Sequence, residues 1–264
     1  TMLLMERVNK TFELGGGTVK RALVDVNLVA NEGDFITIVG SNGAGKSTLL
    51  NMVAGVYLPD SGKIRVNGSE ITNWPEHKRA RYIGRVFQDP MMGTAGSMTI
   101  EENLAMAFKR GQRRGLRLGV GRNRAKFRAV LEELGLGLES RLKDPVRLLS
   151  GGQRQSLTLM MATLTAPKIL LLDEHTAALD PKTAATIIEL TKSIVENHSL
   201  TVLMVTHNLK QALEVGNRTI MMHDGEIVLD LQGKEREETS VDSLLEMFSR
   251  VKKERFLDDR ALLA

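Results

Sequence analysis

Cysteine is absent from the 264-residue sequence, and this absence excludes several kinds of chemistry. Without a thiol the chain forms no disulfide, has no thiolate nucleophile and offers no cysteine ligand to zinc or an iron–sulfur cluster. A chain of this kind fits a reducing compartment. Hydrophobic residues make up 42% and charged residues 26% of the sequence, an ordinary globular composition that argues against long disordered segments.

Long apolar runs are also missing. The longest, such as Leu157–Ala166 and Ile169–Leu172, are far shorter than the roughly 18 residues that cross a bilayer. The first seven residues contain no apolar core behind a basic start, so no signal peptide is predicted. These two observations lead us to expect a soluble protein of the cytoplasm.

Aromatic residues are scarce, at 4% of the chain, whereas basic residues are locally concentrated. The net charge of +4 reflects 36 basic against 32 acidic residues, and nine basic residues fall between Lys109 and Arg128 without one acidic residue. This stretch could face phospholipid headgroups or a partner's acidic loops, or it could be a solvated surface. Nucleic acid is less favoured, because few aromatic side chains are present to stack on bases.

The order of strand and helix patterns predicts an α/β domain interrupted by a helical segment. The expected strands are Leu3–Val8, Ala22–Leu28, Phe35–Val39, 62–67, 82–87, Ile169–Leu172, Thr201–Val205, 219–223 and 226–229. The expected helices are Ser47–Gly55, Glu101–Arg110, Arg124–Glu133, Gln153–Leu164, Pro181–Glu196, Leu209–Val215 and 240–263. We expect one domain over residues 1–264, with an α/β core and β subdomain over 1–88 and 167–235, a helical subdomain over 89–166 and a helical tail over 236–264.

A glycine-rich sequence stands between the strand expected at 35–39 and the helix that follows it. It matches the phosphate-loop pattern G-x-x-x-x-G-K-[ST] and continues with Thr48: Gly40, Ser41, Asn42, Gly43, Ala44, Gly45, Lys46 and Ser47. The glycines let backbone N–H groups point inward around an anion at a helix N-terminus. We expect Lys46 to reach the β- and γ-phosphates and the Ser47 hydroxyl to coordinate Mg²⁺.

Two adjacent acidic residues, Asp173 and Glu174, end the apolar strand expected at 169–172. Burying unpaired charge is costly, so a pair of carboxylates at the end of a buried strand indicates a functional site. We expect Asp173 to hold the Mg²⁺ shell and Glu174 to orient or deprotonate the attacking water. A phosphate loop with this acidic pair leaves several kinds of nucleotide hydrolase open.

A third motif narrows the choice. The sequence Leu149-Ser150-Gly151-Gly152-Gln153-Arg154-Gln155 resembles the signature motif of ATP-binding cassette (ABC) ATPases, and it lies between the phosphate loop and the acidic strand as in that family. The other family segments follow in order: Gln88 is similar to the Q-loop, Ala178-Leu179-Asp180 to the D-loop, and Thr206-His207-Asn208 to the switch-histidine segment. The resemblance covers roughly residues 3 to 235 and implies a P-loop NTPase with a RecA-like core, an antiparallel β subdomain and an inserted helical subdomain.

The resemblance also implies a set of roles for single residues. ATP and Mg²⁺ are the expected ligands, with Ser47, Gln88 and Asp173 near the metal, and with Glu174, His207, Lys46 and Gln88 in catalysis. Phe12 is expected to stack on adenine, although packing in the core is a serious alternative for a lone aromatic residue on a strand. Residues Ser150, Gly151, Gly152, Gln153 and Asp180 are expected to contact a nucleotide bound by a second cassette.

The expected partners follow from the same resemblance. A second copy of the chain would complete two nucleotide sites, and integral membrane permease subunits would dock near residues 88–103, where Met91 and Met92 lie. An extracytoplasmic substrate-binding protein is a further candidate partner, and nucleic acid is not expected. We therefore expect a subunit at the cytoplasmic face of the membrane that powers a transporter, with import favoured over export. The alternative is a soluble ABC ATPase acting on ribosomes or nucleic acid.

One position departs from the family pattern. His175 follows Glu174 where proline is common, so the turn is less rigid and gains a hydrogen-bond donor near two carboxylates. We assign His175 no catalytic role from the sequence. No residue of the chain encodes the cargo, because a cassette contacts nucleotides and permease helices only.

Overall fold

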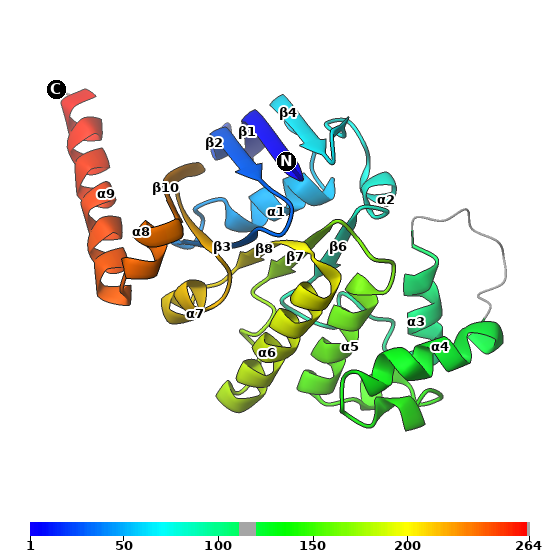
Figure 1. Cartoon of the computed structure of the whole chain (residues 1–264). Helices are drawn as coiled ribbons and strands as arrows, with labels where there is room; N and C mark the ends of the chain where they lie inside the picture. The colour runs from blue at the N-terminus through cyan, green and yellow to red at the C-terminus, as the bar shows by residue number, and fades with distance from the viewer. Residues whose placement is uncertain (111–119, 263–264) are drawn as a thin grey trace.

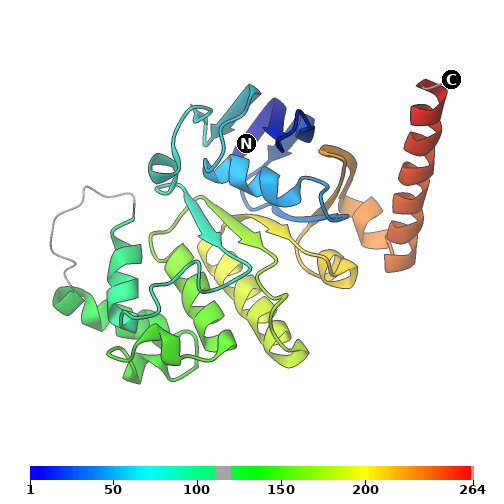
Figure 2. The same cartoon turned by 180° about the vertical axis from the view of Figure 1, so that it is seen from behind.

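The computed structural model describes residues 1–110 and 120–262 of the chain (Figures 1 and 2). Two β-sheets form its centre, and most helices cover the larger sheet on the side away from the smaller one (Figure 1). The last helix extends away from this body and carries the C-terminus (Figure 2). Within the described part of the chain, no helix is long and apolar enough to cross a membrane.

The smaller sheet is antiparallel, with the strand order β2-β1-β4-β5. Its strands are β1 (Leu3–Glu13), β2 (Val19–Ala30), β4 (Ser61–Val66) and β5 (Ser69–Glu70). The first two are longer than predicted, because their pairing continues as far as Glu13 and Val19, on either side of the glycine-rich turn at 15–17. The two-residue strand β5 carries no alternating pattern and was not expected.

The larger sheet has the order β10-β9-β3-β8-β7-β6. Its strands are β3 (Phe35–Gly40), β6 (Ile83–Val86), β7 (Ile169–Asp173), β8 (Thr201–Val205), β9 (Arg218–His223) and β10 (Glu226–Gln232). All neighbours are parallel except β9 and β10. Since β3, β7 and β8 are buried on both faces, their continuous apolar runs fit this sheet as predicted.

The described helices are α1 (Lys46–Ala54), α2 (Glu76–Arg79), α3 (Ile100–Phe108), α4 (Val120–Glu132), α5 (Gly151–Thr163), α6 (Pro181–His198), α7 (Leu209–Glu214), α8 (Gly233–Glu238) and α9 (Val241–Leu262), with 3₁₀ turns at Leu138–Ser140 and Val146–Leu148. Seven of these match expected helices within a few residues. Helices α2 and α8 were not expected, because four and six residues are too few to show a helical period.

Two apolar clusters occupy opposite faces of the larger sheet. Along β7, Leu170 and Leu172 belong to the cluster shared with α3, α4 and α5, whereas Ile169 and Leu171 belong to the cluster between the two sheets and α1. A third, smaller cluster holds the start of α9, where Leu244 is fully buried. The sheet is therefore fixed from both sides, and the loops at its edge are held in place.

The basic stretch 109–128 is only partly described, since Arg113, Arg114 and Arg117 lie outside the described residues. Some side chains of the described part make specific contacts, while Lys126 and Arg128 are exposed. Arg124 donates to both carboxylate oxygens of Glu101, at 2.7 and 2.9 Å, and the Lys126 ammonium lies 4.2 Å from the centre of the Phe108 ring. Contact of this stretch with phospholipid stays a prediction.

Candidate nucleotide-binding site

The glycine-rich loop forms the turn from β3 into α1. Gly40 and Gly45 have positive φ angles of 147° and 101°. A Cβ on Gly40 would lie 2.2 Å from the Met222 carbonyl oxygen, and a Cβ on Gly45 would lie 2.4 Å from that of Ala22, so neither position accepts a larger residue. Helix α1 begins at Lys46 with no side chain capping its first turn. The first N–H groups of the helix have no intrahelical partners and are available to an anion.

Lys46 lies across the inside of this loop. Its Nζ atom donates to the carbonyl oxygens of Gly40 and Ser41, each at 2.9 Å. The residue is 6% exposed, and burial lowers its pKa, an effect that the nearby Glu174 and Asp173 oppose. The loop, the ammonium group and the two carboxylates therefore meet at one place, although Asp173 and Glu174 follow the loop by more than a hundred residues.

A cavity of about 280 Å³ opens beside the loop. It is lined by residues 42–48, by Phe12 of β1, by Lys20 and Ala22 of β2, and by Glu174 and His207. Phe12 is half-buried and packs edge-on against Tyr57, with 5.0 Å between ring centres. Phe12 thus packs against another aromatic side chain and also forms part of the cavity wall. Its stacking on adenine stays a prediction.

Two oxygen atoms lie close enough to bind the same cation, because Ser47 Oγ is 3.3 Å from Asp173 Oδ1. Neighbouring ligands of an octahedral Mg²⁺ with bonds of about 2.1 Å lie about 3.0 Å apart, so this pair fits two adjacent coordination positions. Among the described residues no cluster of three or more acidic or histidine side chains is available to hold a metal alone. The residues present therefore fit Mg²⁺, which prefers to keep water and phosphate oxygens as further ligands.

Arg85 of β6 lies behind Asp173. Its Nη2 atom is 3.8 Å from Asp173 Oδ2, the carboxylate oxygen that does not face Ser47. Burial raises the pKa of Asp173, and the positive charge of Arg85 is the largest of the effects that oppose this rise. Sequence reasoning missed Arg85, although it stands only three residues before Gln88.

Glu174 and His207 are in direct contact at the wall of the cavity, with 2.5 Å between Glu174 Oε1 and His207 Nε2. Glu174 has a φ of 46°, an uncommon conformation for a residue with a side chain and one that is frequent at functional sites. His207 lies at the end of β8 and its side chain is 46% exposed, whereas that of Glu174 is 13% exposed. Both side chains line the cavity, as expected for residues acting on the same phosphate.

Sequence reasoning missed two further polar residues at this site. The Lys20 ammonium lies 3.5 Å from where a Cβ on Gly43 would stand, which adds a cation beside the loop, and no motif marks it. Gln211 of α7 accepts from the Thr206 hydroxyl at 2.6 Å and donates to the Thr176 hydroxyl at 3.4 Å. Gln211 thereby joins the segment before His207 to the segment after Glu174.

The residues of the signature motif lie outside this cavity. Ser150 caps α5 through a reciprocal capping box: its hydroxyl accepts from the Gln153 N–H, and the Gln153 side chain accepts from the Ser150 N–H. A Cβ on Gly152 would lie 2.5 Å from Thr183 Cγ2, so the start of α5 packs closely on the start of α6. Asp180 caps α6 by accepting from the Thr183 N–H at 3.0 Å, and hydrogen bonds from the Thr183 side chain and N–H lower the pKa of Asp180. Signature and D-loop residues are thus neighbours, and none of them lines the cavity.

Gln88 and His175 are also outside the cavity. Gln88 follows β6 and is exposed, so its predicted role near the metal stays a prediction. The expectation that His175 offers a donor near the two carboxylates is wrong for its side chain, which is buried against α6. His175 Nε2 lies 3.2 Å from Thr191 Oγ1, and because that hydroxyl donates to the Ile187 carbonyl, Nε2 is the donor of the pair. Burial lowers the pKa of His175 to about 4.

A phosphate loop after β3, an acidic pair after β7 and a histidine after β8 meet at the carboxyl ends of parallel strands, where open α/β sheets bind ligands. This combination defines a P-loop nucleoside triphosphatase. The model of the family described as "ABC transporter" matches residues 23–177, more than half of the chain. The chain belongs to the ABC transporter family and is an ATP-hydrolysing transport ATPase subunit, and the predicted fold class is confirmed.

Known relatives agree with this assignment. The tyrosine transport ATP-binding protein of Clostridioides difficile is 46% identical over 247 residues, which cover 94% of this chain and 98% of the relative. The methionine import ATP-binding protein MetN 2 of Bacillus cereus is 34% identical over 230 residues, which cover 86% of this chain and 65% of that longer relative. The dimeric ATP-binding cassette MJ0796, solved in a post-hydrolysis state with ADP and Pi, is 31% identical with a TM-score of 0.75, over 88% of this chain and 98% of that one.

Proposed function

We propose that two copies of this chain bind ATP between them and power the import of an amino acid through membrane-spanning permease subunits. The observation that carries the proposal is the separation of the two phosphate-binding sequences. Lys46 and its loop line the cavity, while Ser150 and the signature turn lie outside it. A nucleotide site with both sequences therefore needs a second copy, placed head to tail. The dimeric structure of a relative that is 31% identical supports this arrangement.

The residues at the cavity divide the reaction among them. The loop N–H groups and Lys46 bind the phosphates, and Ser47 with Asp173 holds Mg²⁺, which neutralises phosphate charge when it is bound. Glu174 orients the attacking water, and His207 bonds the γ-phosphate. Asp180 couples the two sites. Placement and charge neutralisation are the main contributions of the protein, since phosphoryl transfer needs little covalent chemistry from it.

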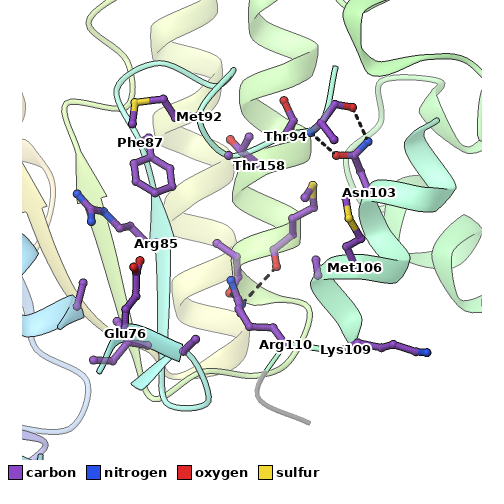
Figure 3. Close-up of a pocket in the computed structure, with 18 of the residues that line it drawn as sticks. Glu76, Arg85, Phe87, Met92, Thr94, Asn103, Met106, Lys109, Arg110 and Thr158 are labelled. Atoms are coloured by element: carbon purple, nitrogen blue, oxygen red, sulfur yellow. Dashed lines mark hydrogen bonds between the residues drawn. The ribbon is translucent and has the colours of Figure 1, made fainter. Parts of the chain in front are cut away.

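A second cavity supplies the docking site for the permease. It has a volume of about 730 Å³ and lies between β6, α3 and α5 (Figure 3). Its walls are mainly apolar, with Phe87, Met92 and Met106 among them, and Met92 is 70% exposed. Flexible methionine side chains suit contact with a partner helix. This cavity includes the segment near residues 88–103 that the sequence suggests as the socket for coupling helices.

The proposed direction and cargo come from the relatives. Two of them carry names for amino acid transport, tyrosine in one and methionine import in the other. We propose import of an amino acid, with a substrate-binding protein outside the membrane and the cassettes at its cytoplasmic face. Uptake of labelled tyrosine and methionine by cells with and without this chain tests the cargo. Equal uptake of both amino acids in the two strains would contradict it.

The variant Glu174→Gln tests the reaction. We expect ATP hydrolysis to fall at least about a hundredfold, because the amide cannot act as a base, while ATP-held dimers persist. Hydrolysis is measured by phosphate release and dimerisation by light scattering. Glu196→Gln, an exposed position on α6, is the matched control and should behave like the parent. Near-normal hydrolysis by Glu174→Gln would overturn the role of Glu174.

A pull-down tests the partners. Tagged Glu174→Gln protein is incubated with ATP and detergent-solubilised native membranes, and the bound proteins are identified by mass spectrometry. Recovery of a polytopic membrane protein in near-equal amount supports the transporter assignment, and its sequence directs the search for cargo. Recovery of ribosomes or nucleic acid without a membrane protein would overturn the proposed partners.

A further inference from the structure

The groove between β6, α3 and α5 lies over the far ends of both helices that begin at phosphate-binding sequences. Ala54, the last residue of α1, lines it, as do Met161 and Ala162 from the last turn of α5. The first turns of the same helices carry Lys46 and the signature turn. An occupant of the groove would therefore touch the C-terminal ends of the two helices whose N-terminal ends the proposed function assigns to phosphate binding.

Each of these C-terminal ends is held by an arginine. Arg79 is fully buried and donates to the carbonyl oxygens of Met52 and Val53 at the end of α1, at 2.8 and 3.1 Å. Arg110 donates through Nη2 to the carbonyl oxygen of Ala162 at the end of α5, at 2.6 Å. The last carbonyl groups of a helix have no intrahelical partners, and a positive charge there is favourable to the helix dipole. Both arginines therefore stabilise the ends that they hold.

The two arginines differ in what can reach them. Arg79 is fully buried and is not among the residues that line the groove. Arg110 is half-buried and lines the groove itself (Figure 3). Arg110 follows α3, so it joins one wall of the groove to the other wall, α5. An occupant of the groove would therefore contact Arg110, whereas Arg79 does not line the groove.

The end of α5 is held tightly at this point. A Cβ on Gly84 would lie 2.5 Å from the Ala162 carbonyl oxygen, so β6 and α5 approach as closely as glycine allows. The Thr165 hydroxyl accepts a further bond from Arg110 at 3.2 Å. Sheet and arginine thus hold the carbonyl end of α5 from two sides.

We propose that Arg110 is a positioning residue for the signature turn, acting on Ser150 through α5. The inference rests on the proposed function, since it assigns the signature turn to ATP-driven pairing of two copies. Helix α5 has 13 residues. A rigid helix of that size is about 20 Å long, so a tilt of about 3° at one end moves the other end by about 1 Å. A displacement of 1 Å at a reacting site can change a rate about a hundredfold.

The test uses the full chain in the Glu174→Gln background. We compare Arg110→Met, Arg110→Lys and Thr165→Val, with Arg128→Met as the control at an exposed position on α4. The ATP concentration for half-maximal dimerisation is measured by light scattering. ADP affinity of the monomer and the thermal unfolding midpoint are measured on the same samples, because a general loss of structure would change both of these as well.

We expect Arg110→Met to raise the half-maximal ATP concentration about tenfold and to leave ADP affinity within twofold of the parent. Thr165→Val should show a smaller rise, about twofold to threefold, and Arg110→Lys should restore most of the loss, since an ammonium group can still bond to Ala162. Arg128→Met should match the parent. Thr165→Val and Arg110→Lys keep the test decisive if Arg110→Met fails to fold.

Two results would overturn the inference in different ways. If the Glu174→Gln parent forms no dimer with ATP, the head-to-tail mechanism is wrong, and so is the role of Arg110 that depends on it. If the parent dimerises and Arg110→Met dimerises equally well, or loses ADP affinity in the same proportion, only the positioning role of Arg110 is wrong.

Discussion

The phosphate-binding sequences at the first turns of α1 and α5 differ in whether a side chain caps the helix. Helix α1 starts after Gly45 with no side-chain cap, whereas α5 starts with the Ser150–Gln153 capping box. An uncapped first turn needs an anion or water to satisfy its N–H groups, while a capped turn is stable alone. The comparison teaches that the chain leaves open the turn that its own cavity surrounds and closes the turn that faces outward.

The opposite ends of these helices are alike. Each is held by an arginine that donates to terminal carbonyl groups, Arg79 for α1 and Arg110 for α5. Burial lowers the pKa of Arg79 to about 10, and burial also lowers the pKa of Arg110. An arginine therefore holds the C-terminal end of each helix. The two arginines differ in that Arg110 lines the groove and Arg79 does not. The following predictions test whether the first turn of α1 and the first turn of α5 have separate functions, the first in nucleotide binding by the monomer and the second in ATP-driven dimerisation.

Lys46→Met should produce the largest effect, and it acts on the α1 side alone. We expect ATP affinity of the monomer to fall about tenfold to a hundredfold, as for loss of a charge-assisted hydrogen bond of about 1.5–3 kcal/mol, and hydrolysis to become undetectable. Binding is measured by fluorescence titration with a labelled nucleotide. Lys63→Met, on the exposed face of β4, is the control and should bind normally. Unchanged ATP affinity in Lys46→Met would contradict the predicted phosphate site.

Ser150→Ala should act on the α5 side alone. Loss of the cap should lower the free energy of unfolding by about 1 kcal/mol. We expect ATP-driven dimerisation in the Glu174→Gln background to weaken about tenfold, while ADP affinity of the monomer is unchanged. Ser240→Ala is a matched control, because Ser240 also accepts from an N–H three residues on, that of Ser243 at the start of α9.

The control should lose similar stability and keep normal dimerisation. If Ser150→Ala weakens ADP binding in the monomer, the two first turns are not separate and the comparison fails. If both serine variants dimerise like the parent, the Ser150 hydroxyl contributes stability alone.

His175 should have the smallest effect on the nucleotide sites at neutral pH, since its contribution is to stability in acid, and it lies in the segment between β7 and α6. The folded chain takes up a proton on this side chain near pH 4, and the unfolded chain near the ordinary value of 6.5. Because the unfolded state binds more protons between these values, stability is lost as the pH falls through them, by about 2 kcal/mol at pH 5. His175→Gln should reduce this loss when urea unfolding is compared at pH 7 and pH 5.

The control is His198→Gln, at an exposed position near the end of α6, which should retain the parent's pH dependence. Equal pH dependence in the two variants would mean that burial of His175 does not govern acid stability. If His175→Gln changes ATP hydrolysis at neutral pH, the contact between His175 and Thr191 also supports the position of Glu174.

Local sequence was sufficient for most of the elements and for the phosphate loop. The β-branched run 35–39, the glycines that follow it and the helix from residue 46 are neighbours in sequence, so their pattern and their geometry coincide. The short elements α2, α8 and β5 were missed, because a helix of one turn or a strand of two residues shows no period. The orientation of His175 was also missed, since the sequence indicates a donor after two acids and not the helix against which that donor packs.

What the sequence determined by itself is the class of chemistry: a phosphate loop, an acidic strand end, a signature turn and a switch histidine, in the order of one family. The tertiary structure alone decided which of these side chains meet. It brought Glu174 and His207 into the cavity beside Lys46, placed Arg85 behind Asp173, and kept Ser150 outside. The physical reason is that motifs depend on neighbouring residues, whereas contacts between strand ends depend on the order of strands in the sheet, which no local pattern specifies.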